Sequence, residues 1–324
     1  MENDNYTAPQ LNEPPKVPVV MQADPKLETR RILLYLAITF IITYFVEIVF
    51  IRPLALEGKD QLKPFLQLLV SGVMFIPALG VLFTRLITKE GFRNSLLRLP
   101  NFKKNLPYYL FAWFGPAILT LFGSVIYFLI NPGNFDPTMP TLAKVYQASG
   151  LEMSTAELQS TMLAQIVTAI LLGPLLNFIN CFGEEWGWRG YLLPKMSNKF
   201  KIVPMLLING FIWGIWHAPL TALGHNYGTE YTGFPYTGIL AMIAFCIILG
   251  TIFSYVTIRT NSCLPAVFAH GSINAFSAVG IYYTADGGNP FIGPSPTGVI
   301  GGIGFIIVAI IFTLLLIKRE SKNA

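Results

Sequence analysis

Apolar runs of about 20 residues recur along the chain, separated by shorter polar segments. Each run has the length that an α-helix needs to cross about 30 Å of hydrocarbon. A bilayer offers no water to unpaired backbone groups, so segments that span it in this way are helical. The runs lie at about 32–51, 65–87, 107–130, 161–193, 203–220, 236–257, 263–283 and 298–317. They predict an all-α, polytopic membrane helix bundle with about eight transmembrane helices.

Composition agrees with this fold class and excludes a soluble one. Hydrophobic residues make up 53% of the 324 residues and charged residues only 12%, against about 25% charged residues in a typical soluble domain. The net charge of +5 comes from basic residues placed between apolar runs, which is the distribution of a membrane protein. We therefore expect no nucleic-acid partner.

The basic residues concentrate on one side of the predicted bundle. All but four of the 22 lysines and arginines fall in the two terminal segments or in the even-numbered loops; the exceptions are Arg52, Lys59, Lys63 and Lys144. The positive-inside rule places the basic side in the cytoplasm, so both termini are expected there. The basic inner face would suit docking on anionic lipid. We expect a multi-pass protein of the plasma membrane whose first partner is the lipid bilayer.

The apolar runs also divide the chain into segments. Residues 1–29 hold five prolines and scattered charges, so they predict a disordered cytoplasmic tail. Residues 30–318 form the transmembrane domain, and 319–324 form a short cytoplasmic tail. The stretch Gly91–Asn105 is compatible with an interfacial helix or with a solvated basic loop.

Two local features complete the expected layout. A short helix is predicted near Leu142–Gln147 within the loop 131–160. The spacing of Gly298 and Gly302 in the last apolar run favours close helix packing.

Ionisable side chains gather in three of the predicted spans, where their cost in hydrocarbon makes them functional candidates. The fourth span contains a Glu-Glu-x-x-x-Arg sequence, the fifth contains a tryptophan four residues before a histidine, and the seventh contains a histidine four residues before an asparagine. The candidates are Glu184, Glu185, Arg189, His217, His270 and Asn274.

Helical spacing predicts which of these side chains share a face. Asn177, Asn180 and Glu184 fall at i, i+3 and i+7, so they form one polar stripe. Glu185 and Arg189 are four residues apart, so they can pair with each other. The alternative for the two glutamates is a pair of interfacial charges on a solvated loop.

Distance along each helix brings the remaining groups to a comparable depth. At about 1.5 Å per residue, Glu184 lies about 15 Å, His217 roughly 20 Å and His270 about 9 Å from the cytoplasmic end of its helix. His270 and Asn274 are four residues apart and point together. We therefore expect one glutamate and two histidines around a cavity reached from the cytoplasm.

This set of groups suits the hydrolysis of a peptide bond. A carboxylate in a poorly hydrated pocket can act as general base toward water. A neutral imidazole can hold the same water or bind a metal, and a His/Asn pair can donate hydrogen bonds to the oxyanion of a tetrahedral intermediate. The alternatives are a packing role for His217 and interhelical polar contacts for His270 and Asn274. His225, in an external loop, is expected to be structural or solvated.

These motifs resemble the CAAX prenyl protease and bacteriocin-processing family, which includes type II CAAX endopeptidases. The family pattern is Glu-Glu-x-x-x-Arg, Phe-x-x-x-His and His-x-x-x-Asn on three helices of an eight-helix bundle. The matching sequence here lies within about 161–283 and reads Glu184-Glu185-x-x-x-Arg189, Trp213-x-x-x-His217 and His270-x-x-x-Asn274. Trp213 departs from the phenylalanine that the family often has at this position.

The resemblance implies a role for each residue. Glu184 would activate the attacking water with His217, and His270 and Asn274 would stabilise the oxyanion. Glu185 and Arg189 would order the site or bind the end of the substrate. Two alternatives stay open for a cofactor: Glu184, His217 and His270 could form a His/His/Glu zinc site, or they could hold the water without a metal, which we slightly prefer.

The sequence thus predicts an enzyme, an intramembrane endopeptidase whose protease domain is 30–318. The expected substrate is a lipid-anchored or membrane-embedded peptide or protein, including a prenylated CAAX-type one. Two other functions remain: a non-catalytic bacteriocin immunity or resistance protein, and a secondary transporter. The transporter is disfavoured because the sequence shows no inverted repeat and no matched pair of broken helices.

Overall fold

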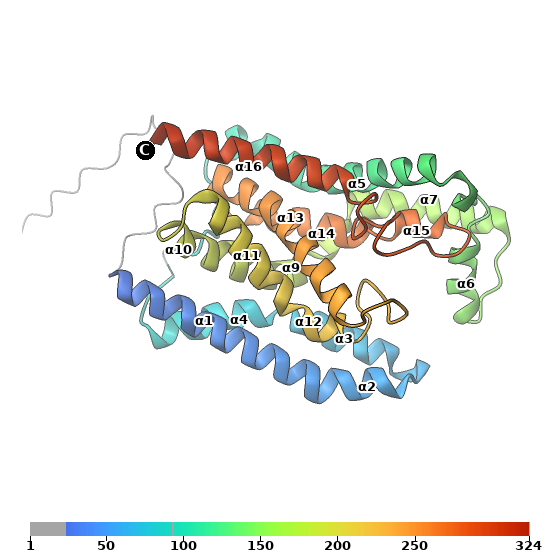
Figure 1. The fold of residues 1–324 in the computed structure, drawn as a ribbon, viewed down its shortest axis with the longest axis horizontal. Helices are drawn as coiled ribbons and strands as arrows, with labels where there is room; N and C mark the ends of the chain where they lie inside the picture. The colour runs from blue at the N-terminus through green and yellow to red at the C-terminus, as the bar shows by residue number, and fades with distance from the viewer. Residues whose placement is uncertain (1–23, 93, 324) are drawn as a thin grey trace, which may run out of the picture.

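The computed structural model describes residues 24–92 and 94–323, and these residues fold into helices without a β-strand. The helices run mostly along the long axis of an elongated bundle (Figure 1). Helices α5 (Phe102–Ile130) and α16 (Ile303–Asn323) lie along one side, and α1 (Pro25–Val46) and α4 (Ile76–Ile87) along the other. Between them lie the four helices that carry the candidate residues or pack against them: α9 (Phe178–Gly187), α11 (Ile202–Trp216), α13 (Tyr236–Thr260) and α14 (Leu264–Phe276).

Shorter elements extend or connect these helices. They are η1 (Glu47–Ile51), α2 (Arg52–Glu57), η2 (Asp60–Leu62), α3 (Lys63–Val73), η3 (Pro132–Asn134), α6 (Pro140–Ala148), α7 (Thr155–Leu171), α8 (Gly173–Leu176), η4 (Trp188–Leu192), α10 (Leu193–Ser197), α12 (Ala218–Thr221) and α15 (Val279–Tyr282). Each of the eight apolar runs coincides with one helix or with a series of consecutive helices. The predicted short helix near Leu142–Gln147 is present as α6.

The all-helical fold class is confirmed. Within residues 24–92 and 94–323, five helical stretches are long and apolar enough to cross a membrane: Pro25–Glu57, Lys63–Ile87, Phe102–Ile130, Tyr236–Thr260 and Leu264–Tyr282. The expected fourth span is instead broken into α7, α8, α9, η4 and α10, and the fifth into α11 and α12. These two broken stretches carry Glu184 and His217, whereas His270 and Asn274 lie on the continuous helix α14. The count of about eight spans and the cytoplasmic termini stay predictions.

The surface of the bundle is apolar in the way that lipid contact requires. Large hydrophobic side chains such as Ile41, Leu129 and Leu176 are 68%, 73% and 71% exposed. The interior, by contrast, contains buried glutamates, arginines and histidines. The chain is therefore an integral membrane protein with a partly polar core.

Several helices begin or end at other residues than the sequence predicts. Helix α1 begins at Pro25 behind an Asp24 cap, so residues 25–29 are helical rather than part of a tail; residues 1–23 lie outside the described residues. Helix α16 continues to Asn323 and thus takes in most of the expected tail 319–324. Within Gly91–Asn105, helix α5 begins only at Phe102, and the described residues before it form a loop. Residues 298–302 form turns before α16 rather than a helical packing motif.

Glycines on α11 bring it close to α13 beneath the candidate site. A Cβ atom at Gly210 would lie 2.5 Å from the Cα atom of Ile247, and one at Gly214 would lie 2.5 Å from that of Ile243. Only glycine allows this approach, because backbone atoms of α13 occupy the space that a side chain would need. The close contact fixes the end of α11, where His217 lies.

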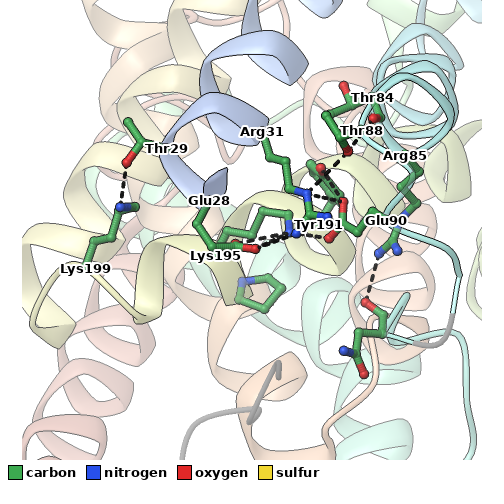
Figure 2. A network of polar contacts seen from close by, with 12 residues as sticks. Glu28, Thr29, Arg31, Thr84, Arg85, Thr88, Glu90, Tyr191, Lys195 and Lys199 are labelled. Carbon is green, nitrogen blue, oxygen red and sulfur yellow. Dashed lines mark hydrogen bonds and ion pairs between the residues drawn. The ribbon is translucent and has the colours of Figure 1, made fainter. Parts of the chain in front are cut away.

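A buried polar network joins three parts of the chain at the end of the bundle where α1 begins (Figure 2). Lys195 of α10 forms ion pairs with Glu28 of α1, at 3.2 Å, and with Glu90 of the loop that follows α4. Arg31 lies 3.0 Å from Glu28, and the Tyr191 hydroxyl donates to Glu90 at 2.8 Å. The network closes this end of the bundle with charges that balance one another.

The network predicts a specific dependence of stability on pH. Burial by itself raises the pKa of Glu90, but the charge and hydrogen bond of Lys195 outweigh it and hold the pKa below its ordinary value. A carboxylate with a lowered pKa stabilises the fold above the unfolded-state pKa of about 4.3, and this contribution is lost as the pH falls through the folded-state pKa. We expect the unfolding temperature to drop below about pH 4, and Glu90→Gln to reduce that drop.

Thermal unfolding in detergent between pH 7 and pH 3 measures this effect. The control is Glu152→Gln, which removes an exposed carboxylate in the segment before α7. If the unfolding temperature fell with pH equally in wild type and Glu90→Gln, the lowered pKa of Glu90 would not be the cause of the acid destabilisation.

Candidate active site

Two consecutive glutamates on α9 point into different surroundings. Successive residues of a helix are turned by about 100°, so adjacent side chains cannot share a face. Glu184, which is 2% exposed, lines a cavity of about 350 Å³, and Glu185 is fully buried behind it. Asn177 and Asn180 line the same cavity. The predicted polar stripe is therefore confirmed, and the alternative of solvated interfacial charges is wrong.

Glu184 is held by an indole. The Nε1–H group of Trp213, on α11, donates a hydrogen bond of 2.7 Å to Glu184 Oε2. A carboxylate that is fixed through one oxygen can direct the other toward a ligand. The phenylalanine that the related sequences often carry at this position has no donor, so this hydrogen bond is a feature of the tryptophan.

His217 is oriented by the same tryptophan through its backbone. The last turn of α11 is tight, and the His217 amide donates to Gly214 O rather than to the Trp213 carbonyl. The Trp213 carbonyl instead lies 2.9 Å from His217 Nδ1. A carbonyl can only accept, so Nδ1 carries the hydrogen and Nε2 of the neutral ring keeps its lone pair. His217 lines the cavity beside Glu184.

The second His/Asn pair lies on α14 and faces the same cavity. His270 and Asn274 both contribute to the cavity lining, as their helical spacing predicts. The Nδ2 group of Asn274 contacts Cys181 Sγ at 3.7 Å. His270 Nδ1 donates to Glu185 Oε1 at 2.9 Å. Its ring is therefore oriented from behind, by a residue that is not part of the cavity wall.

Glu185 and Arg189 form the predicted ion pair, at 3.1 Å, and both side chains are fully buried. Oxygen Oε1 of Glu185 thus bridges Arg189 and His270. The Arg189 guanidinium also lies 4.2 Å from the ring centroid of Trp213. Of the two roles considered for this pair, ordering of the site agrees with the geometry, whereas neither residue lines the cavity to bind a substrate end.

Two residues have a larger place in the site than the sequence indicated. Trp213 contacts Glu184, His217 and Arg189, although its sequence signal was only an aromatic at a motif position. His225 lies in the loop after α12, with its ring parallel to that of His217 at a centroid distance of 6.4 Å. Its side chain is exposed, as expected, but it also lines the cavity. Nothing in a loop sequence fixes where such a side chain lies.

The expectation of a cavity reached from the end that carries the termini is wrong. The lining runs from Glu184 toward His225 in the loop 222–235 and toward Ser295 and Thr297 in the loop 283–302. These loops lie away from the start of α1 and the end of α16 (Figure 1). On the other side of Glu184 the interior is filled by Trp188 and Lys195, which are 0% and 2% exposed. The spacing along each helix predicted how far a residue lies from one helix end. It did not predict at which end of the bundle the cavity opens.

The predicted zinc ligands do not assemble into a metal-binding cluster. In residues 24–92 and 94–323, no three His, Cys, Asp or Glu side chains are arranged to hold a metal ion. Protein oxygens engage only Nδ1 of each histidine, and Trp213 engages only Oε2 of Glu184. Nε2 of both rings and Oε1 of Glu184 are the atoms left to contact a water molecule or a metal. No step proposed below involves a metal.

Comparison with known proteins addresses the family. Residues 164–276 match the Rce1-like family of type II CAAX prenyl endopeptidases. The match covers about a third of the chain, including Glu184, His217, His270 and Asn274. It confirms the resemblance that the motifs predicted and indicates a membrane protease.

One curated relative is similar over a longer segment. Lysostaphin resistance protein A of Staphylococcus haemolyticus (strain JCSC1435) is 31% identical over 170 residues. The aligned segment is 51% of this chain and 42% of that protein, so the chain spans less than half the length of this relative.

The indole of Trp213 provides a sharp test of how Glu184 is positioned. Trp213→Phe keeps a ring against Arg189 and His270 but removes the donor to Glu184. A misplaced catalytic group can cost about 100-fold, so we expect kcat to fall by about 10- to 100-fold while KM changes little. Trp188→Phe, at another fully buried indole outside the cavity lining, is the control. Equal losses in both variants would assign Trp213 a packing role only.

Proposed function

We propose that this protein is an intramembrane endopeptidase that hydrolyses a peptide bond in a membrane-associated protein or peptide. One observation carries the proposal: Trp213 orients both Glu184 and His217 toward one cavity, by its indole and by its carbonyl. A carboxylate and an imidazole held side by side are suited to bind and activate one water molecule. The Rce1-like match covers both residues.

The reaction begins with a water molecule between Glu184 and Nε2 of His217. Glu184 takes one proton from the water as the oxygen attacks the peptide carbonyl, and the carbonyl oxygen becomes an oxyanion. The carbon–nitrogen bond then breaks, and the leaving nitrogen takes the proton from Glu184. The products are a new carboxyl end and a new amino end, and the enzyme returns to its starting state.

His270 and Asn274 stabilise the oxyanion across the cavity. The Asn274 amide is a hydrogen-bond donor, and preformed donors at the developing charge are among the largest contributions to catalysis. Glu185 accepts from Nδ1 of His270 and directs Nε2 toward the cavity as the second donor. Because Nδ1 already carries a hydrogen, Nε2 can donate only when the imidazole is protonated. The Glu185 carboxylate stabilises this charged form, although the same oxygen also pairs with Arg189.

The opening of the cavity bears on the substrate. With both termini in the cytoplasm, a substrate enters from the outer side of the plasma membrane, between the loops 222–235 and 283–302. A lipid-anchored or membrane-embedded peptide can reach this opening from the bilayer. The family match also makes a prenylated CAAX-type peptide a candidate, and such a substrate would require the opposite orientation, with this opening toward the cytoplasm.

A second function is a resistance factor that works by binding rather than by cleavage. The name of the similar Staphylococcus protein, Lysostaphin resistance protein A, favours this candidate. Expression of the wild-type chain and of His217→Ala in a lysostaphin-sensitive host separates the two functions. If the variant protected the host from lysostaphin as well as wild type at an equal protein level, binding alone would be supported.

The proposed activity is tested with purified protein in liposomes and a peptide panel that includes farnesylated CAAX peptides and membrane-spanning peptides. Mass spectrometry identifies the two products. We expect cleavage by wild type, a loss in His217→Ala, and no effect of a strong chelator. If the chelator abolished cleavage and added zinc restored it, Glu184, His217 and His270 would instead be assigned as metal ligands. A folded wild-type protein that cleaves neither the panel nor peptides of native membrane extracts would contradict the proposal.

A further inference from the structure

A second hollow lies at the other end of the bundle, between the start of α5 and the ends of α13 and α16. Its volume is about 670 Å³, and its walls include Tyr108, Tyr255 and Leu315. It shares no lining residue with the candidate active site. The end of α16, marked C in Figure 1, contributes one wall. The hollow therefore offers a separate place for a ligand.

The walls of the hollow carry one sign of charge. The described residues that line it include five cationic side chains and no acidic one; the cations are Lys104, Arg259, Lys318, Arg319 and Lys322. Glu320, the acid nearest to them in sequence, faces elsewhere, because its Oε1 accepts from the Ile202 amide at 3.1 Å. Low-dielectric walls of a single charge sign attract a counter-ion strongly.

Aromatic side chains hold the central arginine in place. Arg259 Nε donates to the Tyr108 hydroxyl at 2.8 Å, and the guanidinium lies 5.9 Å from the ring centroid of Tyr255. Tyr255 itself stacks on Phe312 of α16, with a distance of 3.8 Å between the ring centroids. Burial and the neighbouring Arg259 charge lower the pKa of Arg319. Both guanidinium groups line the same hollow, so an anion bound there would offset the repulsion between their like charges.

The helix ends that form this charged hollow also carry exposed apolar side chains. Phe102 and Leu106 of α5 are 48% and 39% exposed, and Leu314 and Ile317 of α16 are 60% and 38% exposed. A soluble anion would use only the charged part of this surface. A ligand with a phosphate head and hydrocarbon tails would use both parts.

We propose that this hollow binds the phosphate headgroup of an anionic phospholipid, whose acyl chains lie against the exposed apolar residues of α5 and α16. The guanidinium groups of Arg259 and Arg319 match the geometry of phosphate oxygens, and the lysines add charge around them. A zwitterionic lipid is disfavoured, because its ammonium group would meet the same cationic side chains. The proposal is independent of the catalytic activity and stands whether or not the chain cleaves a peptide.

Native mass spectrometry of the purified chain tests the site, with phosphatidylglycerol and phosphatidylcholine as probes. The double variant Lys104→Gln, Arg259→Gln removes two charges from the hollow. The control is Lys103→Gln, Lys201→Gln, which removes two exposed charges at the same end of the bundle but outside the hollow. At about fivefold per charge near a membrane surface, we expect roughly 30-fold weaker binding of phosphatidylglycerol in the first variant. We expect little change in the control.

Three results would overturn the proposal. Equal losses in the two double variants would show diffuse attraction rather than a site. Equal binding of phosphatidylcholine by wild type would remove the requirement for an anionic headgroup. Displacement of the lipid by soluble glycerophosphoglycerol at equal concentration would show that the tails add nothing, and would make the site one for soluble phosphates. Unchanged thermal unfolding confirms that each variant is folded.

Discussion

Glu184→Gln is expected to abolish cleavage, with a loss in kcat/KM of about 100- to 10,000-fold. Glutamine has the same size as glutamate and keeps an oxygen that accepts from the Trp213 indole, so the cavity wall is preserved. It cannot take a proton from water or deliver one to the leaving nitrogen. The measurement is the initial rate of product formation in liposomes, at matched protein content.

The control for this experiment is Glu47→Gln. Glu47 is 1% exposed, like Glu184, but it does not belong to the described lining of the cavity. It therefore reports what the loss of any buried carboxylate does to the protein. A Glu184→Gln enzyme that keeps more than a tenth of wild-type activity, or a Glu47→Gln enzyme that loses as much, would exclude Glu184 as the general base.

Arg189→Met is expected to reduce the free energy of unfolding by about 3–5 kcal/mol. The guanidinium is fully buried and is the cation beside Glu185. Methionine fills much of the volume but leaves the Glu185 carboxylate with only His270 as its partner. An unpaired charge in the interior of a protein costs far more than the ion pair itself contributes. Unfolding by a denaturant in mixed micelles measures the difference.

The double variant Glu185→Leu, Arg189→Met separates charge from packing. Removal of both charged groups leaves no buried carboxylate to solvate, so the double variant should be more stable than Arg189→Met alone. Its activity should still be low, because His270 then has no partner at Nδ1. A double variant whose destabilisation equals the sum of its two single variants would show that the residues are not coupled.

The features of the fold that depend on local periodicity were predictable from the sequence. The apolar runs predicted the positions of the long helices, because about twenty apolar residues in a row have few other structures available. The pairing of Glu185 with Arg189 and the stripe of Asn177, Asn180 and Glu184 follow from helical spacing alone. The pair Gly173-Pro174 could have indicated the break between α7 and α8. The prediction placed one continuous span there, because the residues on both sides of the pair are apolar.

The contacts between helices were beyond the reach of the sequence. The hydrogen bond that His270 donates to Glu185 joins residues 85 positions apart, and no periodicity relates them. The sequence predicted only that an aromatic ring occupies the position of Trp213. The role of its indole N–H depends on which acceptor lies within hydrogen-bond distance, and that acceptor comes from another helix. The open end of the cavity is set by which side chains fill the space below Glu184, and the charge pattern of the loops carries no such information.

The packed interior below Glu184 has a consequence for the membrane as an electrical barrier. The cavity lies at one end of the bundle, and within the described residues Trp188, Tyr191 and Lys195 are buried side chains that do not line it. Ions and protons that enter with the water meet a closed wall and must return the way they came. Such a packed wall suits a protein that admits water to a reaction site within the membrane without forming a channel across it.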